Sequence, residues 1–182
     1  LCQLRPRYAQ ALAEYHRLYE HKTRILRDRE DNPGLLAMLP DFNERMCRVG
    51  AILIYYRARY CRALEGYAAP AHEDCSGGRE KLTLGYETVK TVLDPFAKTE
   101  DIARNLREHQ ESHYHAELAS GLCLSGPHKD DFIVEVNGRS ARQFCSQGQV
   151  RTAALSLKLA DREIHRSAVG EYPVMLLDDV LS

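Results

Sequence analysis

Two motifs near the end of the chain decide its fold: Phe144-Cys-Ser-Gln-Gly-Gln-Val-Arg-Thr152 and Tyr172-Pro-Val-Met-Leu-Leu-Asp-Asp179. The first is a polar turn that contains glycine, and the residues after it repeat apolar side chains at helical spacing. The second is an apolar run, Val174 to Leu177, that ends on two carboxylates. A helix followed by a buried strand with acidic residues at its end is typical of an α/β fold.

The turn formed by Ser146, Gln147, Gly148 and Gln149 is a candidate anion-binding site. It stands where the predicted helix begins, and the first N–H groups of a helix have no intrahelical partner. Those groups, together with the positive end of the helix dipole, favour a bound phosphate. We therefore take these four residues as candidate contacts of a phosphate-bearing cofactor.

Asp178 and Asp179 follow the predicted buried strand Val174 to Leu177. Open α/β sheets bind their ligands at the carboxyl ends of the strands. One carboxylate there can hold Mg²⁺ through water, and its neighbour can orient or deprotonate an attacking water. Taken alone, the pair could instead cap a following helix, but its position after the Ser146 turn favours catalysis.

Composition limits the class of protein. The 182 residues suffice for one ordinary domain or two small ones, and 44% hydrophobic residues can build a core. The net charge of -1 gives no whole-chain signature of nucleic-acid binding, although an acidic face could balance a basic one. No apolar run approaches membrane-spanning length and no signal-peptide pattern is present, so we expect no membrane contact.

Six cysteines without a C-x-x-C pair favour reduced thiols over a zinc site or a disulfide framework, and therefore a cytoplasmic protein. The chain starts at Leu1 and stops at Ser182, directly after the predicted strand. We therefore expect it to be a piece of a longer protein.

Residues 1–120 are predicted to form a helical arm with one short strand. Apolar residues at 4-3 spacing predict one helix over residues 6–30 and a second over residues 42–64, before a break at residues 69–78. Two long helices joined by a short linker should pack antiparallel. Five arginines on the second helix favour a solvated face, with phosphate contact as the alternative: Arg45, Arg48, Arg57, Arg59 and Arg62.

Alternation predicts strands at residues 81–86 and 132–136, with a hairpin turn at Asn137-Gly138 and a returning strand at residues 141–144. Helices are predicted from Thr99, as the N-cap, to Ala119, and from Gly148 to Gly170. These elements complete an α/β arrangement after the helical arm.

Three further clusters are polar. His109 and His113 favour a polar helix surface over a metal site, because Gln110 replaces the glutamate of the zinc-protease pattern. Ser76 to Arg79 looks like a phosphate turn, but a strand pattern follows it, which favours a connector. The segment Gly126-Pro-His-Lys-Asp-Asp131 is either a salt-bridged corner or a functional loop near nucleotide or DNA.

Four stretches together resemble a known family: residues 126–131, Asn-Gly-Arg-Ser-Ala-Arg at 137–142, Ser-Gln-Gly-Gln-Val-Arg-Thr-Ala-Ala-Leu at 146–155, and Gly-Glu-Tyr-Pro-Val-Met-Leu-Leu-Asp-Asp at 170–179. The combination resembles the RecF family of bacterial recombination mediators, which belongs to the ABC-type ATPases related to SMC proteins. The likeness is strongest over residues 122–182 and continues more loosely through the helical arm.

The resemblance implies that residues 121–182 are the C-terminal part of an ABC-type ATPase head, with its signature helix and Walker B strand. ATP would lie between the subunits of an ATP-dependent homodimer. Ser146 and Gly148 would touch the γ-phosphate of ATP held by the other subunit, while Gln147 and Gln149 would shape the turn.

The same resemblance implies that Asp178 holds Mg²⁺ as the Walker B aspartate and that Asp179 is the catalytic carboxylate. It further implies binding to double-stranded DNA near single-strand gaps. The family works with RecO and RecR to load RecA in gap repair and the SOS response.

No G-x-x-x-x-G-K-[ST] loop occurs in the sequence, so we expect ATP hydrolysis from a full-length dimer and none from this chain alone. Two alternatives stay open. One is a non-catalytic DNA- or partner-binding fragment with inert motifs. The other is a different SMC-like ATPase, which would need a coiled coil longer than the ~25-residue helices predicted above.

Overall fold

The computed structural model describes residues 1–176 of the chain. Two compact units are present, and each is built from two separate segments. Unit one comprises residues 1–58 and 87–131, and unit two comprises residues 59–86 and the chain from Phe132 onward. The assignment of an arm to residues 1–120 and of an ATPase-head part to residues 121–182 stays a prediction.

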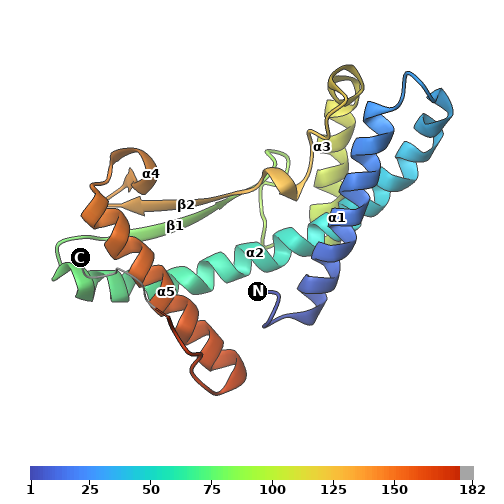
Figure 1. The fold of residues 1–182 in the computed structure, drawn as a ribbon. Coiled ribbons are helices and arrows are strands. Elements are labelled where there is room, and N and C mark those ends of the chain that lie inside the picture. Colours follow the sequence, from blue (N-terminus) through green and yellow to red (C-terminus); the bar gives the residue numbers. More distant parts are fainter. Residues whose placement is uncertain (177–182) are drawn as a thin grey trace. The chain divides into compact units, whose positions relative to one another are not determined.

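Unit one is helical (Figure 1). It contains α1 (Pro6–Arg27), the 3₁₀ helix η1 (Pro33–Met38), the first part of α2 (Leu39–Ser76), α3 (Thr99–Ser120) and the 3₁₀ helix η2 (Pro127–Lys129). The rings of Tyr8 and Tyr56 lie 6.1 Å apart, and those of His21 and Phe42 lie 5.8 Å apart. Because the contacts run in opposite order along the two helices, the predicted antiparallel packing of α1 and α2 is confirmed.

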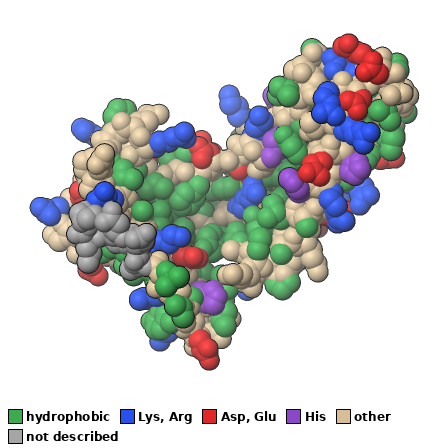
Figure 2. Space-filling model, viewed as in Figure 1, with side chains coloured by type: hydrophobic (Ala, Val, Ile, Leu, Met, Phe, Trp, Pro, Cys, Tyr) green, Lys and Arg blue, Asp and Glu red, His purple; other side chains and the backbone are tan. Residues whose placement is uncertain are grey.

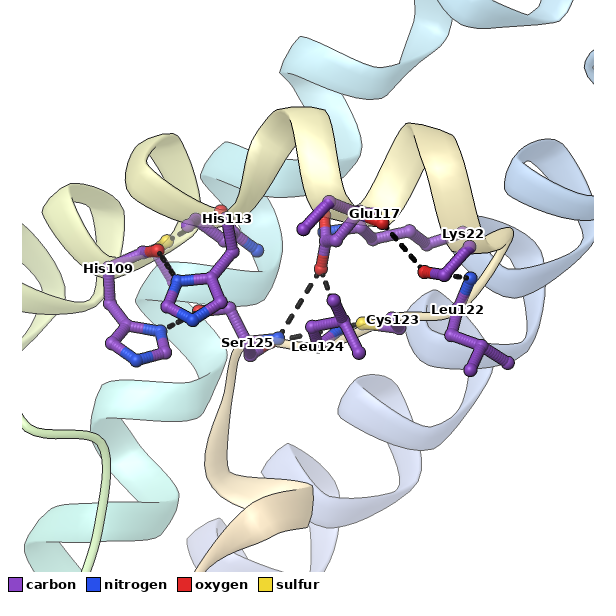
Figure 3. Close-up of polar contacts among 12 residues, drawn as sticks. Lys22, His109, His113, Glu117, Leu122, Cys123, Leu124 and Ser125 are labelled. Carbon is purple, nitrogen blue, oxygen red and sulfur yellow. Dashed lines mark hydrogen bonds and ion pairs between the residues drawn. The ribbon is translucent and has the colours of Figure 1, made fainter.

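A buried ion pair holds unit one together. The Lys22 ammonium lies 2.6 Å from a carboxylate oxygen of Glu117, and both side chains are almost completely buried. The other Glu117 oxygen accepts the backbone N–H groups of Leu124 and Ser125 (Figure 3). A buried charge of either sign is costly without a partner, so α1, α3 and the segment after α3 depend on one another.

Unit two contains the second part of α2, a three-stranded sheet and two helices. The sheet has the order β1-β2-β3, formed by β1 (Leu82–Glu87), β2 (Asp131–Val136) and β3 (Arg139–Ser140). β1 and β2 run in opposite directions (Figure 1). β2 and β3 form the predicted hairpin, in which Asn137 and Gly138 both have positive φ.

Sequence predictions about secondary structure are wrong at residues 69–78 and 141–144. The expected break at residues 69–78 is confined to Gly77 and Gly78, because α2 continues through Pro70 to Ser76. Burial of Ala68, His72 and Ser76 offsets the unfavourable proline. The expected strand at residues 141–144 is the short helix α4 (Ala141–Phe144), since the ladder ends at Ser140 and alanine, arginine and glutamine favour helix.

The buried strand predicted at Val174 to Leu177 is also not formed in its described part. Residues 172–176 have no regular secondary structure, and Val174 and Leu176 are 91% and 93% exposed. A buried parallel strand needs hydrogen-bonding neighbours on both sides. Within residues 1–176 no strand pairs with this segment.

No helix within residues 1–176 is long and apolar enough to cross a membrane. The arginine-rich face of α2 is largely ion-paired. Arg45 contacts Glu14, Arg48 contacts Glu44, and acidic and basic side chains are interspersed over the helices of unit one (Figure 2). This favours a solvated helix face over a phosphate-binding surface.

Candidate functional site

The Ser146 turn opens α5 (Gln147–Val169), as the sequence predicts. The Ser146 hydroxyl oxygen accepts the backbone N–H of Gln149 at 3.3 Å, and the Gln149 side-chain oxygen accepts the backbone N–H of Ser146 at 2.9 Å. This reciprocal pair is a capping box, which a serine followed three residues later by glutamine favours. The helix therefore starts at a fixed residue.

Donor groups of the turn remain open to solvent. Ser146, Gln147 and Gly148 are exposed. The Ser146 hydroxyl uses only its acceptor side in the cap, so its hydrogen is left to donate. The first N–H groups of α5 have no carbonyl within the helix. Among the described residues outside the local backbone, the nearest atom to a Cβ position on Gly148 is the Ser146 hydroxyl oxygen, at 4.0 Å. The turn can therefore donate several hydrogen bonds to one anion.

The Gln149 side chain joins the turn to α2 through a chain of polar contacts. Its amide nitrogen donates to Glu80 at 2.9 Å. The second Glu80 oxygen lies 3.1 Å from Nε2 of His72, whose Nδ1 lies 3.3 Å from the Ser156 hydroxyl. Sequence reasoning missed His72 and Glu80. The available signal was that His72 continues the buried stripe of Leu64 at intervals of four residues.

The series of Ser156, His72 and Glu80 has the connectivity of a hydrolytic triad but not its function. Ser156 is completely buried. Its hydroxyl donates to the Thr152 carbonyl at 2.8 Å. A nucleophile must reach substrate, so this series is structural and couples α5 to α2.

A second contact between the same helices lies further along α5. The Tyr60 hydroxyl donates to the Asp161 carboxylate. Burial and this carboxylate both raise the pKa of Tyr60, so the phenol remains a donor at neutral pH. Together with the buried residues Ala153, Ala160 and Ile164, the contact fixes α5 along most of its length.

The Gly126–Asp131 segment proves to be a salt-bridged corner. Arg57 donates to the Pro127 carbonyl at 2.6 Å and to Asp130 at 3.0 Å. His128 lies between the Tyr15 hydroxyl, at 2.9 Å, and the Cys123 carbonyl, at 3.1 Å. Burial lowers the pKa of His128, which favours the neutral ring. The polar groups of Pro127, His128 and Asp130 therefore stabilise the fold of unit one.

Two other polar clusters have local roles. Nδ1 of His109 lies 2.7 Å from the Ser125 hydroxyl, and Nδ1 of His113 lies 2.9 Å from the His109 carbonyl (Figure 3). Gly77 and Gly78 have positive φ and end α2. The segment is thus a connector, as predicted, and it lies at the carbonyl end of a helix rather than at the end that binds anions.

Asp178 and Asp179 lie outside the described residues. Their roles as magnesium ligand and catalytic carboxylate stay predictions. The described residues form no cluster of three or more metal-ligating side chains.

Comparisons with known proteins agree with this architecture. No protein-family model matches the chain. It is 36% identical over 184 residues to the DNA replication and repair protein RecF of Bacillus subtilis, covering 99% of this chain and 49% of that protein. It is 38% identical over 186 residues to the protein of the same name from Listeria welshimeri, covering 99% and 48%.

Solved structures give the same result. The recombination mediator protein RecF in the RecFOR pathway matches with a TM-score of 0.88 and 31% identity in its ATPrS form. Its ATP form matches with a TM-score of 0.89 and 30% identity. Each comparison covers 98% of this chain and 47% of the other.

These neighbours define the class: the chain has the fold of part of an α/β ATPase head with a helical lobe. The chain belongs to the RecF family. It spans about half the length of the curated relatives that it matches.

Proposed function

We propose that this chain contributes the signature turn of a two-subunit ATP site in a RecF-type protein of DNA replication and repair. In this proposal, Ser146 and Gly148 of one subunit contact the γ-phosphate of ATP held by the other. The observation that carries it is the exposed turn, whose cap leaves the serine hydroxyl hydrogen and the first N–H groups able to donate.

The residues of the turn fit a terminal phosphate. Phosphoryl transfer needs positioning and stabilisation of negative charge more than covalent chemistry. ATP supplies the phosphoryl group. The Ser146 hydroxyl and the N–H groups of Gln147 and Gly148 donate to its oxygens, and Gln149 holds the turn through the capping box.

The remaining parts of the site rest on the family resemblance. Asp178 is proposed to hold Mg²⁺, and Asp179 to orient or deprotonate the attacking water. The protein is proposed to act as an ATP-dependent homodimer in the cytoplasm, on double-stranded DNA near single-strand gaps. RecO, RecR and RecA are the proposed partners in gap repair and the SOS response.

Mixing of two inactive variants tests the composite site. In the complete natural protein that contains this chain, Ser146→Asp keeps a good helix cap but places negative charge against the phosphate. Asp179→Asn removes the proposed catalytic carboxylate. Each variant alone should lose DNA-stimulated ATP hydrolysis. An equal mixture should recover about a quarter of wild-type turnover, because half of randomly assorted dimers contain one intact site of two.

Each of the other outcomes contradicts a different part of the proposal. Full turnover by Ser146→Asp would exclude a role for the turn. Full turnover by Asp179→Asn would exclude that carboxylate as the catalytic one. No recovery in a mixture shown to contain mixed dimers would place both residues in the same subunit's site. A wild-type protein that binds DNA without hydrolysing ATP would favour the non-catalytic alternative.

A further inference from the structure

We propose that Glu80 and His72 are positioning residues for the Ser146 turn, acting through the side-chain amide of Gln149. The proposal rests on the proposed function, since it assigns these residues to the same ATP site. All the groups involved belong to unit two, and Glu80 joins the capped turn of α5 to a buried side chain of α2.

The side-chain amide of Gln149 has two partners, and each needs a different end of the amide. The backbone N–H of Ser146 is a donor, so it requires the amide oxygen. The Glu80 carboxylate only accepts, so it requires the amide nitrogen. Glu80 therefore selects the one amide orientation that also completes the capping box.

Glu80 is itself held in place by His72. The His72 side chain has no exposed surface, and that of Glu80 is 19% exposed. Because the carboxylate cannot donate, Nε2 of His72 carries the hydrogen that joins them at 3.1 Å. Nδ1 of His72 lies 3.3 Å from the Ser156 oxygen of α5, whose hydrogen goes to the Thr152 carbonyl, so this contact packs His72 against α5 while its directed hydrogen bond runs to Glu80.

This arrangement ties the orientation of an exposed turn to a fixed point inside unit two. The capping box and the Thr152 hydroxyl, which donates to the Gly148 carbonyl at 3.0 Å, also restrain the turn, but both act within α5 and leave its start exposed on one side. The donors to a phosphate need accurate placement, because small displacements of catalytic groups weaken transition-state binding. Loss of the tether should therefore slow turnover without changing nucleotide binding by the opposite subunit.

A reciprocal exchange of side chains tests the tether. In Glu80→Gln, the new amide oxygen can accept from only one of its two donor partners, His72 Nε2 or the Gln149 amide nitrogen. The new NH2 group then faces the other donor. In Gln149→Glu, the capping box persists because glutamate suits this position, but two carboxylates face each other. The double variant restores every contact. The amide nitrogen introduced at position 80 can donate to the carboxylate introduced at position 149, while the amide oxygen at position 80 accepts from His72.

The measurements are kcat for DNA-stimulated ATP hydrolysis and the nucleotide dissociation constant of the complete natural protein. Each single variant should lower kcat about tenfold, the size of effect expected for one hydrogen bond to a charged group. Nucleotide affinity should stay within about twofold. The double variant should return to within about threefold of wild-type kcat. Glu73→Gln, at an exposed position of α2, is the matched control and should behave as wild type.

The inference fails if either single variant retains wild-type kcat, or if the double variant is as slow as the two losses combined. It also fails if kcat and nucleotide affinity fall together, since that result indicates general damage to unit two. A failure here with Ser146→Asp still inactive would leave the proposed ATP site standing. Full activity of Ser146→Asp would remove both proposals.

Discussion

Two short segments of this chain look alike in sequence and differ in what they leave unpaired. Gly126–Asp131 and Ser146–Gln149 each combine glycine with polar side chains. In the first, Arg57 donates to the Pro127 carbonyl and to Asp130, so these groups are paired within unit one. In the second, the cap fixes the backbone and the remaining donors face solvent.

A set of reactive residue types does not by itself define a site. Titratable groups that satisfy one another stabilise a fold, whereas a site needs donors or acceptors that are held in place and still unused. The Gly126 segment has more charged and titratable side chains than the Ser146 turn, but His128 and Asp130 are paired within unit one. The Ser146 turn has one hydroxyl and a few N–H groups, but these belong to exposed residues at the start of a capped helix.

The largest effect should come from Gly126→Ala. Gly126 has φ 135° and ψ 175°, a conformation essentially limited to glycine, and a Cβ there would overlap the Tyr15 hydroxyl. Backbone strain and overpacking of about 1–3 kcal/mol each predict a loss of about 4 kcal/mol in the free energy of unfolding, measured by urea titration. Gly34→Ala, which meets no atom within 4 Å, should change stability by less than about 1 kcal/mol. Equal losses from the two variants would mean that the corner is not rigid.

Removal of Lys22 should have the next largest effect. Lys22→Met leaves the buried Glu117 carboxylate without its cation, next to the N–H groups that lead into the Gly126 segment. We expect unfolding free energy to fall by about 3 kcal/mol, in the range for breaking a buried pair. The control is Arg104→Met, in the exposed Arg104–Asp101 pair, with a loss below about 1 kcal/mol. Recovery in Lys22→Met/Glu117→Gln would identify the unpaired charge as the cause, and a small loss from Lys22→Met alone would contradict it.

Cysteines that precede the two segments allow the contrast to be measured directly. Burial raises the pKa of Cys123 to about 11, so about one thiol in a thousand is ionised at pH 8. Cys145, beside the turn, is partly exposed. Iodoacetamide should therefore label Cys145 at least about a hundredfold faster than Cys123 at pH 8.

The labelling of Cys123 should also accelerate with pH. Because its folded-state pKa is raised, the thiolate fraction keeps increasing about tenfold per pH unit up to about pH 11. Urea-unfolded protein should label both cysteines at similar rates. Comparable rates in the folded protein would show that the Gly126 corner opens as readily as the Ser146 turn.

Sequence reasoning found the parts of this fold that depend on local pattern. The helix start at the Ser146 turn, the Asn137-Gly138 hairpin and the helices at α1 and α3 follow from residue types a few positions apart. The predicted N-cap of α3 is wrong by one residue, because Lys98 rather than Thr99 precedes the helix. The continuation of α2 through Pro70 could not be predicted in this way, because burial of His72 and Ser76 by distant residues decides it. Local propensity is overridden wherever tertiary packing is strong.

The candidate site likewise contains residues that local sequence predicts and residues that only the fold brings together. Ser146, Gln147, Gly148 and Gln149 are predicted from their order in the sequence, and their contact with phosphate stays a prediction. Glu80 was missed because it lies 69 residues from Gln149, and only the fold brings the two side chains together. The corner interpretation of the Gly126 segment likewise needed Arg57, which lies 73 residues before Asp130.

The smallest effect on the free energy of unfolding should come from substitution of Ser146. The same substitutions separate a structural role of the turn from phosphate binding most sharply. Ser146→Ala removes the side-chain acceptor of the Gln149 N–H and should lower the free energy of unfolding by about 1 kcal/mol. Ser146→Asp keeps an acceptor at the same position and should be close to wild type in a urea titration. If the turn only capped α5, ATP turnover in the complete natural protein would follow stability, and the aspartate variant would be the more active of the two. If the turn binds phosphate, the aspartate variant is the less active although it is the more stable, because its charge repels the anion that the serine hydroxyl would bind.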